Sequence, residues 1–124
     1  NSASRLEGLT RVYHLPVIVS EYVKDDVLSV TDRYRFYEVD TVQVKGKTEG
    51  KKIFFPYDTN EKNEELENKW QIFESALQNY YSGDWAQSRS LMQGCGLELC
   101  GVFIERMKNS LPENWSGIWT MTSK

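Results

Sequence analysis

The chain has 124 residues, a formal net charge of −3, and 40% hydrophobic and 13% aromatic residues. This length suits one domain, or part of one with an appendage, and the composition fits a packed core better than a disordered chain. The sequence has no basic stripe suited to nucleic acid, and no apolar run approaches the roughly 20 residues that a membrane-spanning helix needs.

The first ten residues predict an amphipathic helix, because its apolar residues recur every three or four positions, at Ala3, Leu6, Leu9 and Tyr13. Asn1 and Arg5 lie four residues apart, so they project from one face, one turn from each other. A guanidinium offers a planar fork of donors that fits a phosphate, and an amide can hold a sugar or phosphoryl oxygen. These two residues alone also fit a plain surface helix.

The residues after this helix, up to about residue 57, predict three strand-like regions and one short helix. Leu15-Pro16 ends the first helix, and residues 17–20 form a short apolar run typical of a buried strand. A short helix follows over residues 21–30, with Tyr22 or Val23, Val27 and Val30 expected to face inward. Residues 34–44 predict a strand with a bulge near Asp40-Thr41, and residues 46–50 predict a turn. Ile53, Phe55 and Tyr57 alternate along the return strand, which Pro56 and the polar run after it are expected to end.

The segment N-S-A-S-R-L-E-G-L-T, with its Asn1-x-x-x-Arg5 pattern, resembles the catalytic helix of class III nucleotidyl cyclases. The resemblance covers residues 1–57 and includes Lys45-Gly46-Lys47 at the hairpin turn. It implies an α+β fold, the terminal portion of a ferredoxin-like cyclase domain. It also implies that Asn1 orients the substrate ribose, Arg5 stabilises charge on the reacting phosphate and Lys45 contacts the terminal phosphates. Lys47 has no matched role.

The implied activity is the conversion of ATP (or GTP) to the cyclic nucleotide and pyrophosphate in signal transduction. An adenylate cyclase that makes cyclic AMP is favoured, and the choice between adenine and guanine stays open. The family's Mg²⁺ or Mn²⁺ carboxylates lie upstream of the matched segment, as do the residues that select the base. Asp25, Asp26 and Asp40 are therefore interpreted as surface or turn residues. Family members act as dimers, so a second cyclase protomer, in a homodimer, is the expected partner. The chain opens on a helical motif, and we expect a cytoplasmic fragment of a longer protein that is inactive by itself.

Residues 58–68 form a polar, acidic stretch that we interpret as a linker, and the excess acidic charge of the chain lies from here onward. Residues 69–124 then predict a helical tail. One helix is indicated by the series Leu66, Trp70, Phe73, Leu77 and Tyr80 or Tyr81; a second by Trp85, Ser88, Leu91 and Met92; and a third by Leu97, Cys100, Phe103, Ile104, Met107 and Leu111. Ser82-Gly83-Asp84 is expected to end the first and cap the second, and Pro112 to end the third.

This tail resembles one tetratricopeptide unit through Ala76, Tyr80, Gly83 and Trp85, although Ser88 stands where a small Ala is usual. Trp115 and Trp119 either staple the end of the chain to the helices or dock a partner. A non-catalytic interaction module that uses the helical tail is therefore the alternative function. Cys95 and Cys100 do not form a zinc pattern and are expected to be buried, reduced thiols, with His14 in a loop or cap.

Overall fold

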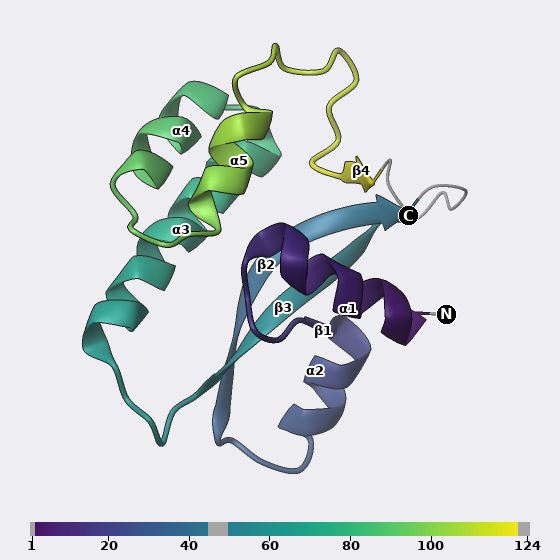
Figure 1. The fold of residues 1–124 in the computed structure, drawn as a ribbon, viewed down its shortest axis with the longest axis vertical. Helices are drawn as coiled ribbons and strands as arrows, with labels where there is room; N and C mark the ends of the chain where they lie inside the picture. The colour runs from purple at the N-terminus through teal and green to yellow at the C-terminus, as the bar shows by residue number, and fades with distance from the viewer. Residues whose placement is uncertain (1, 45–49, 122–124) are drawn as a thin grey trace. The chain divides into compact units, whose positions relative to one another are not determined.

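The chain is a mixed α+β protein, as the sequence predicts, and its computed structural model describes residues 2–44 and 50–121, with side chains for residues 8–43 and 50–120. Its contacts define two units, each described by itself: the sheet unit (residues 1–62 and 118–124) and the helical unit (residues 63–117). The sheet unit contains α1 (Ser2–Tyr13), β1 (Val19–Ser20), α2 (Glu21–Leu28), β2 (Tyr34–Val44), β3 (Lys51–Asp58) and β4 (Trp119–Met121) (Figure 1). The helical unit contains α3 (Glu64–Ser82), α4 (Trp85–Gln93) and α5 (Cys100–Arg106).

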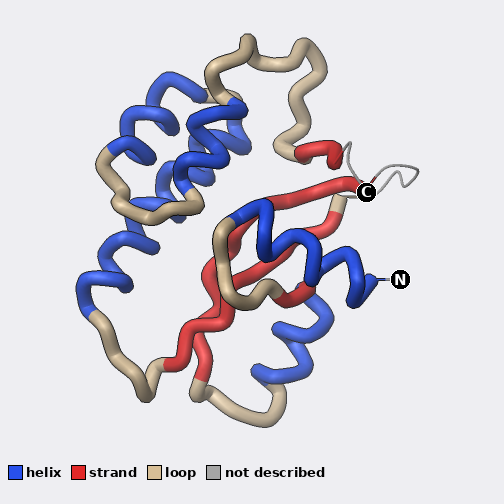
Figure 2. The backbone as a smooth tube through the Cα atoms, viewed as in Figure 1, coloured by secondary structure: helices blue, strands red, loops and turns tan. Residues whose placement is uncertain are grey.

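The described strands form one mixed sheet in the order β1-β3-β2-β4 (Figure 2). β3 pairs antiparallel with both β1 and β2, whereas β4 pairs parallel with β2. Both bounds of β2 agree with the predicted strand, and its register shifts between Glu38 and Asp40, beside the predicted bulge. The bulge keeps Tyr37 and Val42 on one face, since their partners on β3 lie four residues apart.

β3 continues through Pro56 to Asp58, so the prediction that Pro56 ends this strand is wrong. Pro56 pairs with Phe36 of β2, while the pairing of β1 with β3 is confined to Ile53 and Phe54. Proline lacks an N–H and is tolerated where a strand has a neighbour on one side only. That β1 does not extend alongside Pro56 is a feature of the tertiary structure, and the sequence does not reveal it.

β4 was not predicted, because residues 113–124 read as a polar tail. Its Trp119 pairs with Val42, so the backbone of this tryptophan belongs to the sheet. Gly50 provides room for the segment that enters β4, since a Cβ at this position would lie 2.8 Å from Cδ1 of Ile118. The absence of a side chain at Gly50 lets Ile118 seat beside the sheet.

α2 differs most from its prediction. Ser20 begins it by accepting a hydrogen bond at Oγ from Val23 N (3.2 Å), yet none of its residues is buried. Tyr22 is 79% and Val30 81% exposed, so their expected inward orientation is wrong. The helix has only 8 residues, and Lys24 reaches from it over the sheet, its Nζ lying 5.0 Å from the centre of the Phe54 ring. An aliphatic lysine stem can cover an apolar surface in this way.

The helical unit follows the predicted periodicity closely. α3 buries the apolar stripe Trp70, Phe73, Ala76, Leu77 and Tyr80. Gly83 ends it in the left-handed conformation (φ 95°), and Asp84 then caps α4 by accepting a hydrogen bond from Gln87 N. α3 already begins at Glu64, within the stretch interpreted as a linker. These caps confirm that Ser82-Gly83-Asp84 separates two helices.

α5 is shorter than predicted and ends at Arg106, so the expected helix through Leu111 is wrong. Leu111 is 46% exposed, and its Cδ2 lies 3.5 Å from where a Cβ of Gly83 would stand. Leu111 therefore packs on the helix-ending glycine from an irregular segment. Leu111 is apolar because it packs against Gly83, and not because it continues the apolar face of a helix.

Candidate functional site

The three predicted site residues fall at the margins of what the structure describes. Asn1 and Lys45 lie outside the described residues. Arg5 is described in its backbone, within α1, which begins at Ser2 and confirms the predicted helix. Lys45 directly follows Val44, the last residue of β2. The site can therefore be built from the elements that carry these residues, α1 and the β2–β3 hairpin.

α1 is anchored to the sheet at its carboxyl end. Leu9 and Tyr13 are buried, and Tyr13 Oη donates a hydrogen bond to Asp40 Oδ2 (2.6 Å). Asp40 Oδ1 also accepts a hydrogen bond from Thr41 N (2.8 Å). His14 then takes a positive φ of 58° directly after the helix, which confirms its interpretation as a loop or capping residue.

Asp40 is fully buried, so its interpretation as a surface or turn residue is wrong. It lies on β2 directly after the bulge, where the shift in register turns its side chain toward α1. A buried carboxylate is costly unless hydrogen bonds satisfy it, and Tyr13 and Thr41 both do so. The sequence did mark Asp40 as unusual, because a bulge was predicted at this residue. A bulge does not reveal, however, toward which face of the sheet the aspartate side chain points.

The β2–β3 hairpin leads from this anchor to the segment that contains Lys45. β2 and β3 pair from Tyr34 with Asp58 to Val42 with Lys51, and β4 pairs with β2 over Val42 to Val44. β2 thus has a paired strand on both sides near its end. Figure 1 shows the start of α1 and the end of β2 toward the same side of the sheet unit. The elements that carry Arg5 and precede Lys45 belong to one packed unit.

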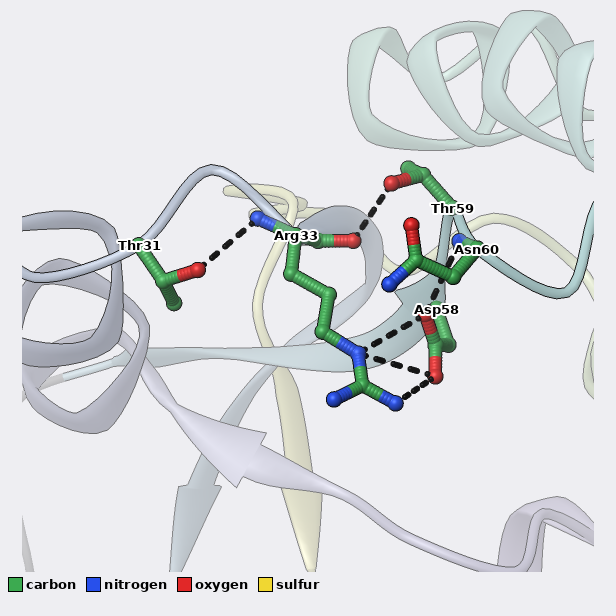
Figure 3. A network of polar contacts seen from close by, with 5 residues as sticks. All are labelled: Thr31, Arg33, Asp58, Thr59 and Asn60. Atoms are coloured by element: carbon green, nitrogen blue, oxygen red, sulfur yellow. Dashed lines mark hydrogen bonds and ion pairs between the residues drawn. The ribbon is translucent and has the colours of Figure 1, made fainter.

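The other end of the hairpin is closed by an ion pair (Figure 3). Arg33 Nη2 lies 2.7 Å from Asp58 Oδ2, and Arg33 Nε also donates to this carboxylate. Asn60 N donates to Asp58 Oδ1, and Thr59 Oγ1 donates to Arg33 O (2.6 Å). The hydrogen bonds from Arg33 and Asn60 lower the pKa of Asp58, and those to Asp58 raise the pKa of Arg33. Because Arg33 and Asp58 bond to each other and to the neighbouring residues Thr59 and Asn60, we call this cluster the clasp and interpret it as structural.

Two further polar groups lie on the face of the sheet that carries Phe54. Glu38 pairs with Phe54 across the strands; its Oε1 lies 3.4 Å from Lys52 Nζ, and its buried Oε2 has no hydrogen-bond partner. Lys24, whose Nζ lies over the Phe54 ring, also forms an ion pair with Asp25 (2.9 Å). Within residues 2–44 and 50–121, no group of three or more His, Cys, Asp or Glu residues is placed to hold a metal ion. This finding does not bear on the metal-binding carboxylates that the cyclase resemblance implies, because those lie upstream of the matched segment.

Models of known protein families, curated protein sequences and solved structures yield no match to this chain. Among the residues that the structure describes, no helix is long and apolar enough to cross a membrane.

Proposed function

We propose that this chain is the C-terminal part of a class III nucleotidyl cyclase, an adenylate cyclase in preference to a guanylate cyclase. The observation that carries the proposal is the order of the helices and strands, together with the positions of three residues along that order. The helix α1, which contains Arg5 and is preceded in the sequence by Asn1, comes before a short strand, a short helix and an antiparallel hairpin, and Lys45 follows the first hairpin strand in the sequence. The resemblance of residues 1–57 to the family involves this same order.

Each residue has a role that its chemistry can perform. Arg5 stabilises charge on the α-phosphate as it is attacked, because a guanidinium keeps its charge and presents a fork of donors. Asn1 orients the ribose, whose 3′-hydroxyl attacks the α-phosphate, loses its proton and expels pyrophosphate. Lys45 contacts the terminal phosphates as a compact charge. Mg²⁺ or Mn²⁺, bound by carboxylates outside this chain, would polarise the phosphates and help to activate the hydroxyl.

The sheet unit supports this proposal by the way it fixes α1. The Tyr13–Asp40 hydrogen bond joins the helix that carries Arg5 to the strand that precedes Lys45. Arg5 lies two turns before Tyr13 on the same helix, so the anchor restrains its backbone relative to β2. Electrostatic catalysis needs such preorganisation, because a displaced cation stabilises the transition state less. The helical unit is then an appended tail that resembles a tetratricopeptide unit.

The test is production of cyclic AMP and cyclic GMP by the longer parent protein with Mn²⁺ or Mg²⁺. We expect Arg5→Ala to lower kcat about 10²–10³-fold, the typical loss when one transition-state donor is removed. Arg11→Ala is the matched control, since Arg11 is an exposed arginine on the same helix. Lys45→Ala should weaken ATP binding and turnover, whereas Lys47→Ala should have little effect.

A second experiment tests the dimeric site. Mixing this chain with a protomer that supplies the metal carboxylates but lacks its own Arg5 equivalent should produce activity, and Arg5→Ala in this chain should abolish it. Full activity with Arg5→Ala would overturn the assignment. A parent that makes neither cyclic nucleotide would leave the interaction module, with the helical unit as its binding part, as the function.

A further inference from the structure

The last described segment of the chain returns to the sheet unit and joins the end of β2. β4 pairs in parallel with the last three residues of β2, ending with Met121 beside Val44. The described pairing of β2 with β3 ends earlier, at Val42 with Lys51. Lys45 follows Val44 directly in the sequence. β4 therefore holds the strand end that leads to the lysine proposed to contact phosphate.

The same segment contacts the start of β3. Gly50 is the residue before β3, and Ile118 is the residue before β4. A Cβ at Gly50 would lie 2.8 Å from Cδ1, 3.0 Å from Cγ1 and 3.2 Å from Cγ2 of Ile118, so the isoleucine side chain lies directly against the glycine backbone. Residues 45–49 are thus flanked in the sequence by Val44 and Gly50, which both contact this segment. We call residues 118–121 the strap.

The start of the strap is fixed by contacts within the helical unit. Trp115 Nε1 donates hydrogen bonds to Tyr80 O (2.9 Å) and Tyr81 O (3.0 Å) at the end of α3. Gly117 is buried and takes a positive φ of 84°, and a Cβ on it would lie 3.4 Å from Tyr81 O. Ile118 is the next residue in the chain. The strap therefore begins directly after an anchored glycine.

A strand as short as β4 needs such an anchor. β4 has only 3 residues, and a strand pair of this length gains too few hydrogen bonds and too little buried surface to offset the ordering of its backbone. Anchoring one end of a segment raises the effective concentration of the rest at its binding site, so docking costs less entropy. The strap is held in place by its pairing with β2, the Ile118 contact and the anchor at Gly117 together.

We propose that the strap is a positioning element of the cyclase site, which restrains the connection between β2 and β3 so that Lys45 meets the terminal phosphates of ATP. This inference rests on the proposed function and gives the C-terminal segment a role in it. The strap acts through the backbone of the hairpin. A lysine side chain is long and flexible, so restraint of its backbone reduces the freedom that is lost when the ammonium binds phosphate.

Hydrogen exchange in the 124-residue chain tests whether the strap holds β2. Truncation after Gly117 removes the strap, and exchange in the peptide that contains Val42 to Val44 should accelerate about 10-fold or more, because its pairing strand is gone. Truncation after Met121 keeps the strap and is the matched control. Peptides from α3 to α5 should exchange equally in the two truncated chains. The proposal is overturned if the Val42–Val44 peptide also exchanges equally in both.

Two small substitutions test the strap without shortening the chain. Gly50→Ala places a Cβ against Ile118 and should displace the strap, whereas Ile118→Ala removes the three atoms that this Cβ would meet. Each single variant should accelerate exchange in Val42 to Val44. In the double variant, Gly50→Ala should add nothing to the effect of Ile118→Ala, because the crowded atoms are absent. Independent, additive effects would contradict the contact on which the proposal depends.

The KM for ATP of the longer parent protein tests the positioning role. Truncation after Gly117 should raise KM about 10-fold, the loss expected when one hydrogen bond to a charged group is weakened. In a Lys45→Ala background the same truncation should leave KM unchanged, since the strap acts through this lysine.

An equal rise in KM with and without Lys45 would mean that the strap supports only the fold, and it would overturn the positioning role. The same holds for a truncation that leaves KM unchanged in the parent that retains Lys45. A wild-type parent that makes no cyclic nucleotide would instead overturn the proposed function itself. The wild-type activity and the effect of the truncation therefore distinguish the two failures.

Discussion

The helical unit and the sheet unit bury their residues in different ways. In the helical unit, Tyr80 is fully buried, and its ring lies 5.0–5.7 Å from the rings of Phe103, Trp115 and Trp85. In the sheet unit, α2 has no buried residue, and the core instead includes the carboxylate of Asp40. Apolar and aromatic residues at helical spacing predict a hydrophobic core well when the next helices along the chain pack against that face, as α4 and α5 do on α3. The same spacing predicts little for α2, which lies beside the sheet with none of its residues buried.

The largest expected effect is the loss of the ring at the centre of the helical unit. Tyr80→Ala should lower the free energy of unfolding of this unit by about 3–5 kcal/mol, because it leaves a cavity among packed rings. Hydrogen exchange read peptide by peptide should show the loss in α3 to α5. Tyr22→Ala, at a 79% exposed tyrosine of α2, should change stability by less than about 0.5 kcal/mol. A large effect at Tyr22 would contradict the contrast between the units.

The second effect tests the polar anchor of the sheet unit. Tyr13→Phe removes the donor to Asp40 Oδ2, and the loss should destabilise the sheet unit by about 1–3 kcal/mol, the cost of a buried acceptor left without its partner. Urea unfolding followed by circular dichroism measures it. Tyr22→Phe removes an exposed hydroxyl and should be neutral. An unchanged Tyr13→Phe variant would mean that the contact does not hold α1 in place.

The third effect concerns the two tryptophans near the end of the chain. Trp115 Nε1 donates to the carbonyls of Tyr80 (2.9 Å) and Tyr81 (3.0 Å), which confirms that this tryptophan staples the helices. The last carbonyls of a helix have no partner within it, so this indole satisfies the end of α3. Trp115→Phe should lower the stability of the helical unit by about 1 kcal/mol. Trp119→Phe should instead accelerate hydrogen exchange in β2, its pairing strand.

The smallest effect is the pH dependence of the clasp at the hairpin end. Arg33 lowers the pKa of Asp58, so the clasp stabilises the fold above the unfolded pKa of about 4. Its contribution is lost as pH falls through the lower, folded pKa. The difference in urea midpoint between wild type and Asp58→Asn should be present at pH 7, vanish near pH 2 and shrink in high salt, since the Arg33 side chain is 51% exposed. A difference that grows toward low pH would contradict the direction of the shift.

The sequence predicted the helix and the hairpin that carry the candidate site, but not the contact that joins them. The Asn1-x-x-x-Arg5 pattern and the aromatic strand of residues 34–44 indicate a helix and a hairpin, and α1 and β2 confirm both. The partnership of Tyr13 with Asp40 was not predictable, because 27 residues separate them and only the bulge turns the acid toward the helix. The roles of Asn1, Arg5 and Lys45 stay predictions.

The sequence by itself determined the local features of this protein: where α1, β2 and α3 run, the caps at Gly83 and Asp84, and the buried stripe of α3. Each depends on residues within a few positions of one another, and short-range backbone preferences and periodicity are visible in any chain. Tertiary structure alone decided the parallel pairing of β4 with β2, the exposure of α2 and the burial of Asp40. These depend on which distant surface fills the space beside a residue, and that surface exists only once the chain has folded.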